Sequence, residues 1–197
     1  SASTTTGSTG DYSTAMGYET TASGENSTAM GYNTTASDYF STAMGYYTIA
    51  SGYYSTAMGF QTKANYFYST AIGSGTTASG NTSTAMGNET TASGDFSTAM
   101  GNHTTASAYF STALGAFTIA SGDNSTAMGS NTTASDYSST VIGQHNSSGS
   151  TATSATSFST LAPAFVIGNG VDASNKSDAF SVLFNGNTTI GGSLTLN

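Results

Sequence analysis

The sequence predicts an all-β fold: a narrow parallel β-solenoid, or β-roll, of 14-residue coils, followed by a short β-rich C-terminal segment. Three observations support this. A pentapeptide recurs at a fixed interval of 14 residues, the residues within each copy alternate as in a short strand, and large apolar residues are too scarce for an ordinary globular core.

The repeat is a pair of pentapeptides. The first, Ser-Thr-Ala-Met-Gly, has its Ser at positions 13, 27, 41, 55, 69, 83, 97, 111, 125 and, as Ser-Thr-Val-Ile-Gly, 139. The second, Thr-Thr-Ala-Ser-Gly at Thr20–Gly24, returns in variant form up to Thr132–Asp136. Every step is 14 residues without an insertion, so the pattern predicts stacked structural repeats.

Each pentapeptide fits a short strand better than a helix. Ser, Thr, Gly and Asn, which fill most positions, are weak helix formers. Within Ser13–Gly17, a strand would point Ser, Ala and Gly to one side and Thr and Met to the other. We expect Gly to form the sharp corner after the strand. Two strands and two corners then make one coil, and successive coils stack about 4.8 Å apart.

Composition explains why such a chain needs a stacked fold. Val, Ile, Leu and Phe make up roughly 13% of the residues, below the ~20% at which chains are usually disordered. Stacking compensates, because every strand hydrogen-bonds to the coils above and below it. A 14-residue coil is so flat that only small side chains fit inside, which predicts an interior of alanine columns that begin at Ala15 and Ala22.

Charge and hydropathy exclude several partners. The chain has 2 Lys+Arg against 10 Asp+Glu, a net charge of −8, so nucleic acid and anionic membrane surfaces are disfavoured. No apolar run approaches the ~18 residues of a spanning helix, and we expect no direct membrane insertion. With no Cys, neither a disulfide framework nor a thiolate metal site is available.

A column of methionines is expected to point away from the alanine interior. Such an interior stabilises a single solenoid only marginally, and an outward apolar stripe is typical of an association face. We therefore expect several copies of the chain to pack their stripes together, and odd-order cyclic symmetry would place all of these faces around one axis. The alternative is a wider monomeric roll with Met inside and Ala outside. The predicted interface residues are Met16, Met30, Met44, Met58, Ile72, Met86, Met100, Leu114, Met128 and Ile142.

Aromatic residues concentrate at the variable corners of the coils. Exposed Tyr offers contact area at low entropic cost, as glycan- or protein-binding surfaces use it. The alternative is that rings stack from coil to coil and stabilise the edge or a seam between subunits. The candidate receptor-binding residues are Tyr39, Phe40, Tyr46, Tyr47, Tyr53, Tyr54, Tyr66, Phe67 and Tyr68.

The two pentapeptides resemble the head repeat of YadA-type trimeric autotransporter adhesins, whose pattern is Ser-x-Ala-Ile/Met-Gly followed by Ala-x-Gly. The resemblance covers about Ser13–Gly143. It implies a left-handed parallel β-roll that trimerises, extracellular display on a cell surface and adhesion. Thr14 and its equivalents stand where family members often carry Val, which implies a wetter interface.

The phase of the repeat breaks after Gly143, which suggests three parts. Residues 1–143 form the β-roll, 144–163 a Ser/Thr/Ala-rich connector, and 164–197 a β-rich neck or shaft with two short apolar strands that each end in Asn-Gly. The stretch Phe184–Asn197 is similar to segments that precede the self-cleaving trimerisation chaperone of phage tail-fibre-like and bacterial surface proteins.

The candidates for chemistry are weak. His103 and His145 occupy the same corner column three repeats apart, about 14 Å along the stack, and cannot converge on one metal or substrate. No serine has a base and an orienting carboxylate in a recognisable motif. Acidic corners such as Asp11 and Glu25 supply too few oxygens per coil for Ca²⁺. We expect no catalytic site, no metal and no cofactor.

These observations leave three functional hypotheses. The first is a non-enzymatic segment of an extracellular trimeric fibre or surface appendage. It would bind a host-surface glycan or protein, or neighbouring fibres, and copies of it could join end to end into filaments. The second is a phage tail-fibre shaft for host recognition, located in the virion tail. The third is an ice-binding solenoid, suggested by the Thr columns that begin at Thr14 and Thr20.

Overall fold

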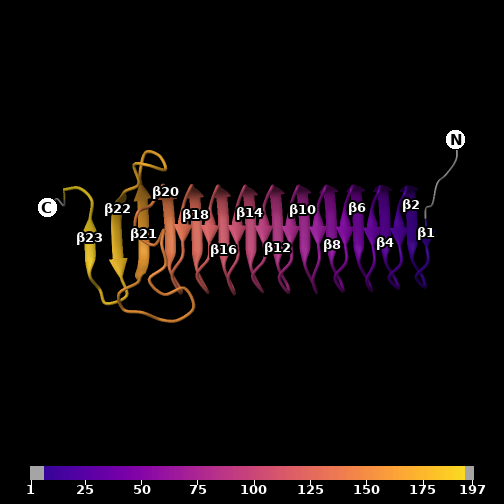
Figure 1. The fold of residues 1–197 in the computed structure, drawn as a ribbon, viewed down its shortest axis with the longest axis horizontal. Helices are drawn as coiled ribbons and strands as arrows, with labels where there is room; N and C mark the ends of the chain where they lie inside the picture. The colour runs from indigo at the N-terminus through magenta and orange to yellow at the C-terminus, as the bar shows by residue number, and fades with distance from the viewer. Residues whose placement is uncertain (1–6, 194–197) are drawn as a thin grey trace. The chain divides into compact units, whose positions relative to one another are not determined.

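The computed structural model describes residues 7–193, and every regular element in them is a β-strand. The chain falls into two compact units, residues 1–96 and 97–197, which are described separately. In each unit one long and one short strand make a coil, as predicted (Figure 1).

In the first unit the long strands form one parallel sheet and the short strands another, each strand paired with its equivalent one coil away. The long strands are β2 (Thr14–Tyr18), β4 (Thr28–Tyr32), β6 (Thr42–Tyr46), β8 (Thr56–Phe60), β10 (Thr70–Ser74) and β12 (Thr84–Asn88). The short strands are β1 (Gly7–Ser8), β3 (Thr21–Ala22), β5 (Thr35–Ala36), β7 (Ile49–Ala50), β9 (Lys63–Ala64), β11 (Thr77–Ala78) and β13 (Thr91–Ala92).

The second unit begins with the same architecture and ends differently. Its long strands are β14 (Thr98–Asn102), β16 (Thr112–Ala116), β18 (Thr126–Ser130) and β20 (Thr140–Gln144). Its short strands are β15 (Thr105–Ala106), β17 (Ile119–Ala120) and β19 (Thr133–Ala134). The chain then adds β21 (Pro163–Asn169) parallel to β20, and β22 (Asp178–Leu183) and β23 (Thr188–Ile190) in antiparallel order.

Strand register keeps identical residues in ladders. On β4 and β6, for example, Ala29 pairs with Ala43 and Met30 with Met44. The alanine columns are fully buried from Ala22 onward, and beside them lie buried Ser and Thr side chains such as Ser41 and Thr48. The predicted alanine interior is therefore confirmed, together with the parallel solenoid of 14-residue coils.

Glycine occupies a different place from the one we expected. Gly45 lies within β6 at a φ of 128°, and a Cβ added there would come 2.0 Å from the carbonyl oxygen of Gly59 in the next coil. The expectation that this glycine forms the corner is wrong. It is required because the backbones of successive coils approach each other too closely for a side chain.

The corners are made by residues that are mostly not glycine. Each coil has a first corner after its long strand and a second corner after its short strand, and each corner contains a residue with positive φ, such as Tyr47 (54°) and Phe40 (56°). The N–H of Tyr47 donates to the carbonyl of Tyr32 (2.9 Å), and that of Phe40 to Glu25 (2.9 Å). The left-handed conformation thus keeps the corners hydrogen-bonded from coil to coil, which offsets its cost of about 1–3 kcal/mol.

The end of the repeats is closed by the segment between β20 and β21. Asp136 stands where most other coils have a buried Gly, and its carboxylate accepts hydrogen bonds from the backbone of Thr153 and Ser154. Val141 and Val166, both fully buried, take the place of interior alanines on β20 and β21.

The C-terminal strands follow the alternation predicted for them in part. Asn185-Gly186 turns the chain between β22 and β23, with Leu183 N–H donating to the Asn187 carbonyl (2.9 Å). Asn169-Gly170, by contrast, opens a longer loop that leads to β22. Residues 194–197 of the tail-fibre-like stretch lie outside the described residues.

Candidate functional site

The methionine stripe, defined by the ten predicted interface residues, lies on the outer face of the long strands. Each member is the third residue of its strand and follows an interior alanine, or Val141 in β20. Met16 is 56% exposed and Met44 36%, whereas Ala29 and Ala43 are 0% exposed. The alternative with Met inside and Ala outside is therefore wrong for this chain. Whether the stripe forms a trimer interface stays a prediction.

Within each unit the stripe is a ladder of adjacent apolar side chains. In the first unit, Met30 pairs with Met44, Met44 with Met58, and Met58 with Ile72. In the second unit, Met100 pairs with Leu114 and Met128 with Ile142. Such a row of apolar side chains on the surface is typical of an association face rather than of scattered exposed residues.

The first aromatic edge lies where the long strands lead into the first corners. It consists of Tyr18, Tyr32, Tyr46 and Phe60, each the last residue of its long strand, and of Tyr47 at the corner itself. Tyr32 stacks on Tyr18 (centroids 4.9 Å apart) and on Tyr46 (5.0 Å), and Tyr46 stacks on Phe60 (5.4 Å). Tyr47 meets Tyr46 edge-on at 4.6 Å. The edge is a ladder of stacked rings with one ring, Tyr47, held at a steep angle beside it.

The second aromatic edge consists of residues at the second corners, and its rings form a denser cluster. Phe40 stacks on Tyr54 (4.6 Å) and Tyr54 on Tyr68 (5.5 Å), while Tyr53 meets Tyr54 edge-on at 4.6 Å. The members of this edge are Tyr39, Phe40, Tyr53, Tyr54, Tyr66, Phe67 and Tyr68.

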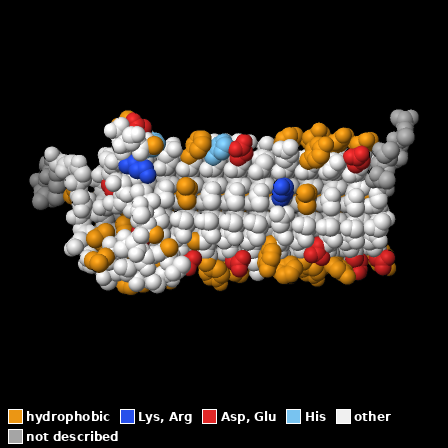
Figure 2. Space-filling view, in the orientation of Figure 1, with side chains coloured by type: hydrophobic (Ala, Val, Ile, Leu, Met, Phe, Trp, Pro, Cys, Tyr) orange, Lys and Arg blue, Asp and Glu red, His pale blue; other side chains and the backbone are white. Residues whose placement is uncertain are grey.

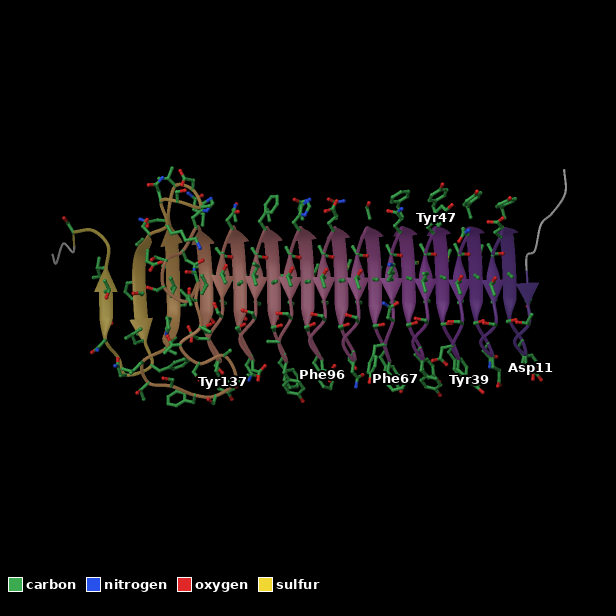
Figure 3. The ribbon with its side chains drawn as sticks, in the orientation of Figure 1. Asp11, Tyr39, Tyr47, Phe67, Phe96 and Tyr137 are labelled. Carbon is green, nitrogen blue, oxygen red and sulfur yellow. The ribbon has the colours of Figure 1, made fainter. Side chains whose placement is uncertain are left out.

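The nine candidate receptor-binding residues therefore do not form one surface. Tyr46 and Tyr47 belong to the first edge and the other seven to the second, and Figure 3 shows Tyr47 on the opposite side of the first unit from Tyr39 and Phe67. In Figure 2 hydrophobic side chains gather along both edges of this unit, with mostly polar, uncharged surface between them. Sequence reasoning grouped them because they are close in the chain.

Ring packing changes the acidity of two phenols. Partial burial raises the pKa of Tyr53 above its ordinary value, and the Tyr54 phenol beside it raises it further. Partial burial also raises the pKa of Tyr32, with a contribution from Tyr47. Both groups are neutral at physiological pH, so these edges offer apolar rings and neutral hydroxyls to a ligand.

The titratable residues of the second unit are held in separate local contacts. The His103 ring stacks on Phe117 at 4.8 Å. The pKa of Asp172 is lowered by hydrogen bonds from the Asn175 side chain and the backbone of Ser174 and Asn175, which together form a loop. Among the described residues, no three or more His, Cys, Asp or Glu side chains are grouped so that they could hold a metal ion.

The threonine columns differ in their position. Thr28 and its equivalents lie on the outer face of the long strands, but Thr20, Thr34, Thr48 and Thr62 are fully buried. The second of the two Thr arrays that suggested ice binding therefore cannot meet a crystal surface. Within residues 7–193, no helix has the length and apolarity to cross a membrane.

A stack of 14-residue coils with a small-residue interior and outer apolar ladders defines a repeat solenoid of the head-domain type. The family model of the YadA head domain repeat matches residues 8–34, 22–48, 50–65, 67–90, 91–118 and 120–146. These matches cover more than half of the chain, which belongs to this family. It is an adhesin-type structural domain, surface-exposed and trimer-forming, and not an enzyme family. No curated protein matches the chain.

Proposed function

We propose that the chain is a non-enzymatic, adhesive segment of an extracellular trimeric fibre or surface appendage, in which repeats set the length and corner aromatics contact a receptor or neighbouring fibres. The observation that carries the proposal is the methionine stripe. Its side chains point outward while the interior of the repeat coils holds only small residues, so the apolar groups of the stripe remain available for a partner.

The partner that fits best is another copy of the chain. Burying apolar surface contributes about 25 cal/mol per Å², and side chains repeated at every coil can meet an identical stripe along its whole length. Odd-order cyclic symmetry brings all stripes to one axis. The Thr rows beside the stripe, such as Thr42 and Thr56, would make the rim of this interface polar.

The three-part division belongs to the same proposal. Residues 1–143 would form the repeat head, 144–163 the connector and 164–197 the neck or shaft. The hydrogen bonds of Asp136 to Thr153 and Ser154 support a connector that folds back on the last coils.

The stripe can be tested by replacing Met30, Met44 and Met58 together. We expect the triple Met→Ser variant to lose self-association, because polar hydroxyls replace the apolar contact, and to unfold at a lower temperature. Light scattering and intact-mass measurement give the subunit number. The matched control is the triple Met→Leu variant, which keeps the apolar surface as Leu114 does naturally and should remain a trimer. A monomeric natural chain, or a Ser variant that remains trimeric, would contradict the proposal.

The aromatic edges can be tested one at a time. We expect Tyr53→Ser with Tyr54→Ser to reduce adhesion of the chain to host-cell glycoproteins while the unfolding temperature changes little. Ser is compatible with the left-handed corner, as Ser138 (φ 55°) occupies the same place in its coil. Tyr46→Ser with Tyr47→Ser is the matched variant on the first edge. Unchanged adhesion together with a large fall in stability would instead favour stacking as the role of the rings.

A phage tail-fibre shaft is the second candidate, and the stretch that begins at Phe184 is the observation that favours it. A self-cleaving chaperone encoded immediately downstream, among virion genes, would support it. The ice-binding hypothesis keeps only the outer Thr array that begins at Thr14. Thermal hysteresis of the purified protein tests it, and a result of no hysteresis at high protein concentration would exclude ice binding.

A further inference from the structure

One groove in the first unit lies beside Tyr47 of the first aromatic edge. It has a volume of about 420 Å³ and is lined by Tyr47, Ile49, Gln61, Lys63, Gly75 and Thr77. These residues come from three successive coils: the first corners supply Tyr47, Gln61 and Gly75, and the short strands β7, β9 and β11 supply the others. The volume is within the range of small-ligand sites.

Three departures from the repeat meet in this groove. In the first unit, the first residues of the short strands β3 to β13 form a row from coil to coil. This residue is Thr in every one of these strands except β7 and β9, where it is Ile49 and Lys63. The first corner carries a side chain in every coil of the unit except at Gly75. A gap, an apolar wall and a cation are therefore placed together in consecutive coils.

The groove has a defined chemical polarity. Lys63 is one of only two basic residues in the chain, and its neighbours along the row are Ile49 and Thr77. At the other end, a Cβ added at Gly75 would lie 3.3 Å from the Glu89 side chain, so Glu89 borders the gap. A ligand that fits both ends has one negative group for Lys63 and neutral hydroxyls toward Glu89.

Tyr47 is positioned to stack on such a ligand. Its ring contacts are with Tyr46 at 4.6 Å and Tyr32 at 5.7 Å, in its own coil and the preceding one, while the groove extends toward the two following coils. Tyr47 is 40% exposed. Aromatic faces of this kind pack on the apolar face of a sugar ring, and the Gln61 amide and Thr77 hydroxyl can bond its hydroxyls.

We propose that this groove binds a saccharide that carries a single carboxylate, with the carboxylate at Lys63 and the sugar ring on Tyr47. A polyanion such as a nucleic acid or a polysulfated glycan fits less well, because one Lys must act against a net charge of −8. The proposal adds a ligand class for the first aromatic edge to the proposed adhesive function. It rests on that function for its biological role, whereas the binding itself can be measured independently.

The test measures binding of 3′-sialyllactose, lactose and sodium acetate to the purified full chain by saturation-transfer NMR and calorimetry. We expect sialyllactose to bind at least about tenfold more tightly than either of the others, as loss of one charge-assisted hydrogen bond predicts. Lys63→Gln should reduce sialyllactose to the level of lactose. Gly75→Asn should fill the gap and weaken all saccharide binding without unfolding the coil, since Asn33 occupies the same corner at a φ of 52°.

Two matched controls complete the test. Lys176→Gln removes the other lysine, which does not line the groove, and Asn33→Gly opens the same corner in a coil without Lys; both should leave sialyllactose binding unchanged. Equal binding of sialyllactose and lactose, binding of acetate as tight as that of sialyllactose, or an unaffected Lys63→Gln variant would overturn the proposal. Adhesion that persists under any of these outcomes would leave the adhesive function in place, which separates the two failures.

Discussion

Replacing Gly73 by Ala is expected to lower the free energy of unfolding by about 3 kcal/mol or more. A Cβ at this position would lie 2.0 Å from the carbonyl oxygen of Gly87 in the next coil, and backbone cannot move aside as a flexible side chain can. The residue also has a φ of 127°, a conformation that side chains disfavour. Overpacking of about 1–3 kcal/mol and strain of similar size act together. Denaturant unfolding at a fixed protein concentration measures the loss.

The matched control lies two residues away in the same coil. Gly75 has a φ of 65°, and its added Cβ comes closest to the flexible Glu89 side chain, at 3.3 Å, while the Glu89 backbone is no nearer than 3.8 Å. Gly75→Ala should therefore cost much less than Gly73→Ala. Equal effects at the two positions would show that conformational freedom alone, and not the close approach of successive coils, explains the glycine column.

The sequence was sufficient to predict the repeat architecture because stacking leaves little freedom. A fixed period of 14 residues without insertions places Ala29 over Ala43 and Met30 over Met44, and strand alternation then separates the two ladders. Only the alanine ladder is small enough for the interior of so short a coil. The direction of the methionine stripe followed from the same argument and is confirmed by its exposure.

The corners could not be predicted in the same way. Local rules assign a left-handed residue to Gly or Asn, but here Tyr47, Tyr54 and Phe96 adopt it. Their N–H groups donate to the carbonyl of the coil before, so the conformation is set by stacking and not by the residue itself. For the same reason the sequence did not reveal that Tyr47 and Tyr54, at the first and second corners of one coil, lie on different edges.

The groove beside Tyr47 was missed, although a signal was present. A comparison of equivalent positions in successive repeats would have singled out Ile49, Lys63 and Gly75. Ile49 and Lys63 replace a Thr that is otherwise almost constant, and Gly75 has no side chain at a corner where the other coils of the unit have one. The sequence alone could not show that these three residues line the same groove. The corner and the short strand had to be placed side by side before a gap at Gly75 became part of the same groove as Lys63.

Enlarging an interior alanine should be about as damaging as the glycine substitution. Ala57 on β8 is fully buried and lies between Ala43 and Ala71 in its ladder. In Ala57→Leu, three additional carbons must enter an interior whose strand spacing is fixed by hydrogen bonds to both neighbouring coils. We expect a loss of about 3 kcal/mol, at the upper end of ordinary overpacking. Hydrogen exchange should show the loosening concentrated in the coils that contain Ala43, Ala57 and Ala71.

The neighbouring residue provides the control, because its side chain points to the opposite side of the same strand. Thr56 is partly exposed on the outer face of β8, so Thr56→Leu adds apolar surface without entering the interior. It should change stability by less than about 1 kcal/mol. If Ala57→Leu were tolerated as well as Thr56→Leu, the interior would have room to spare. The outward methionines would then no longer follow from lack of space inside the coil, and the reason for seeking their partner in another chain would be lost.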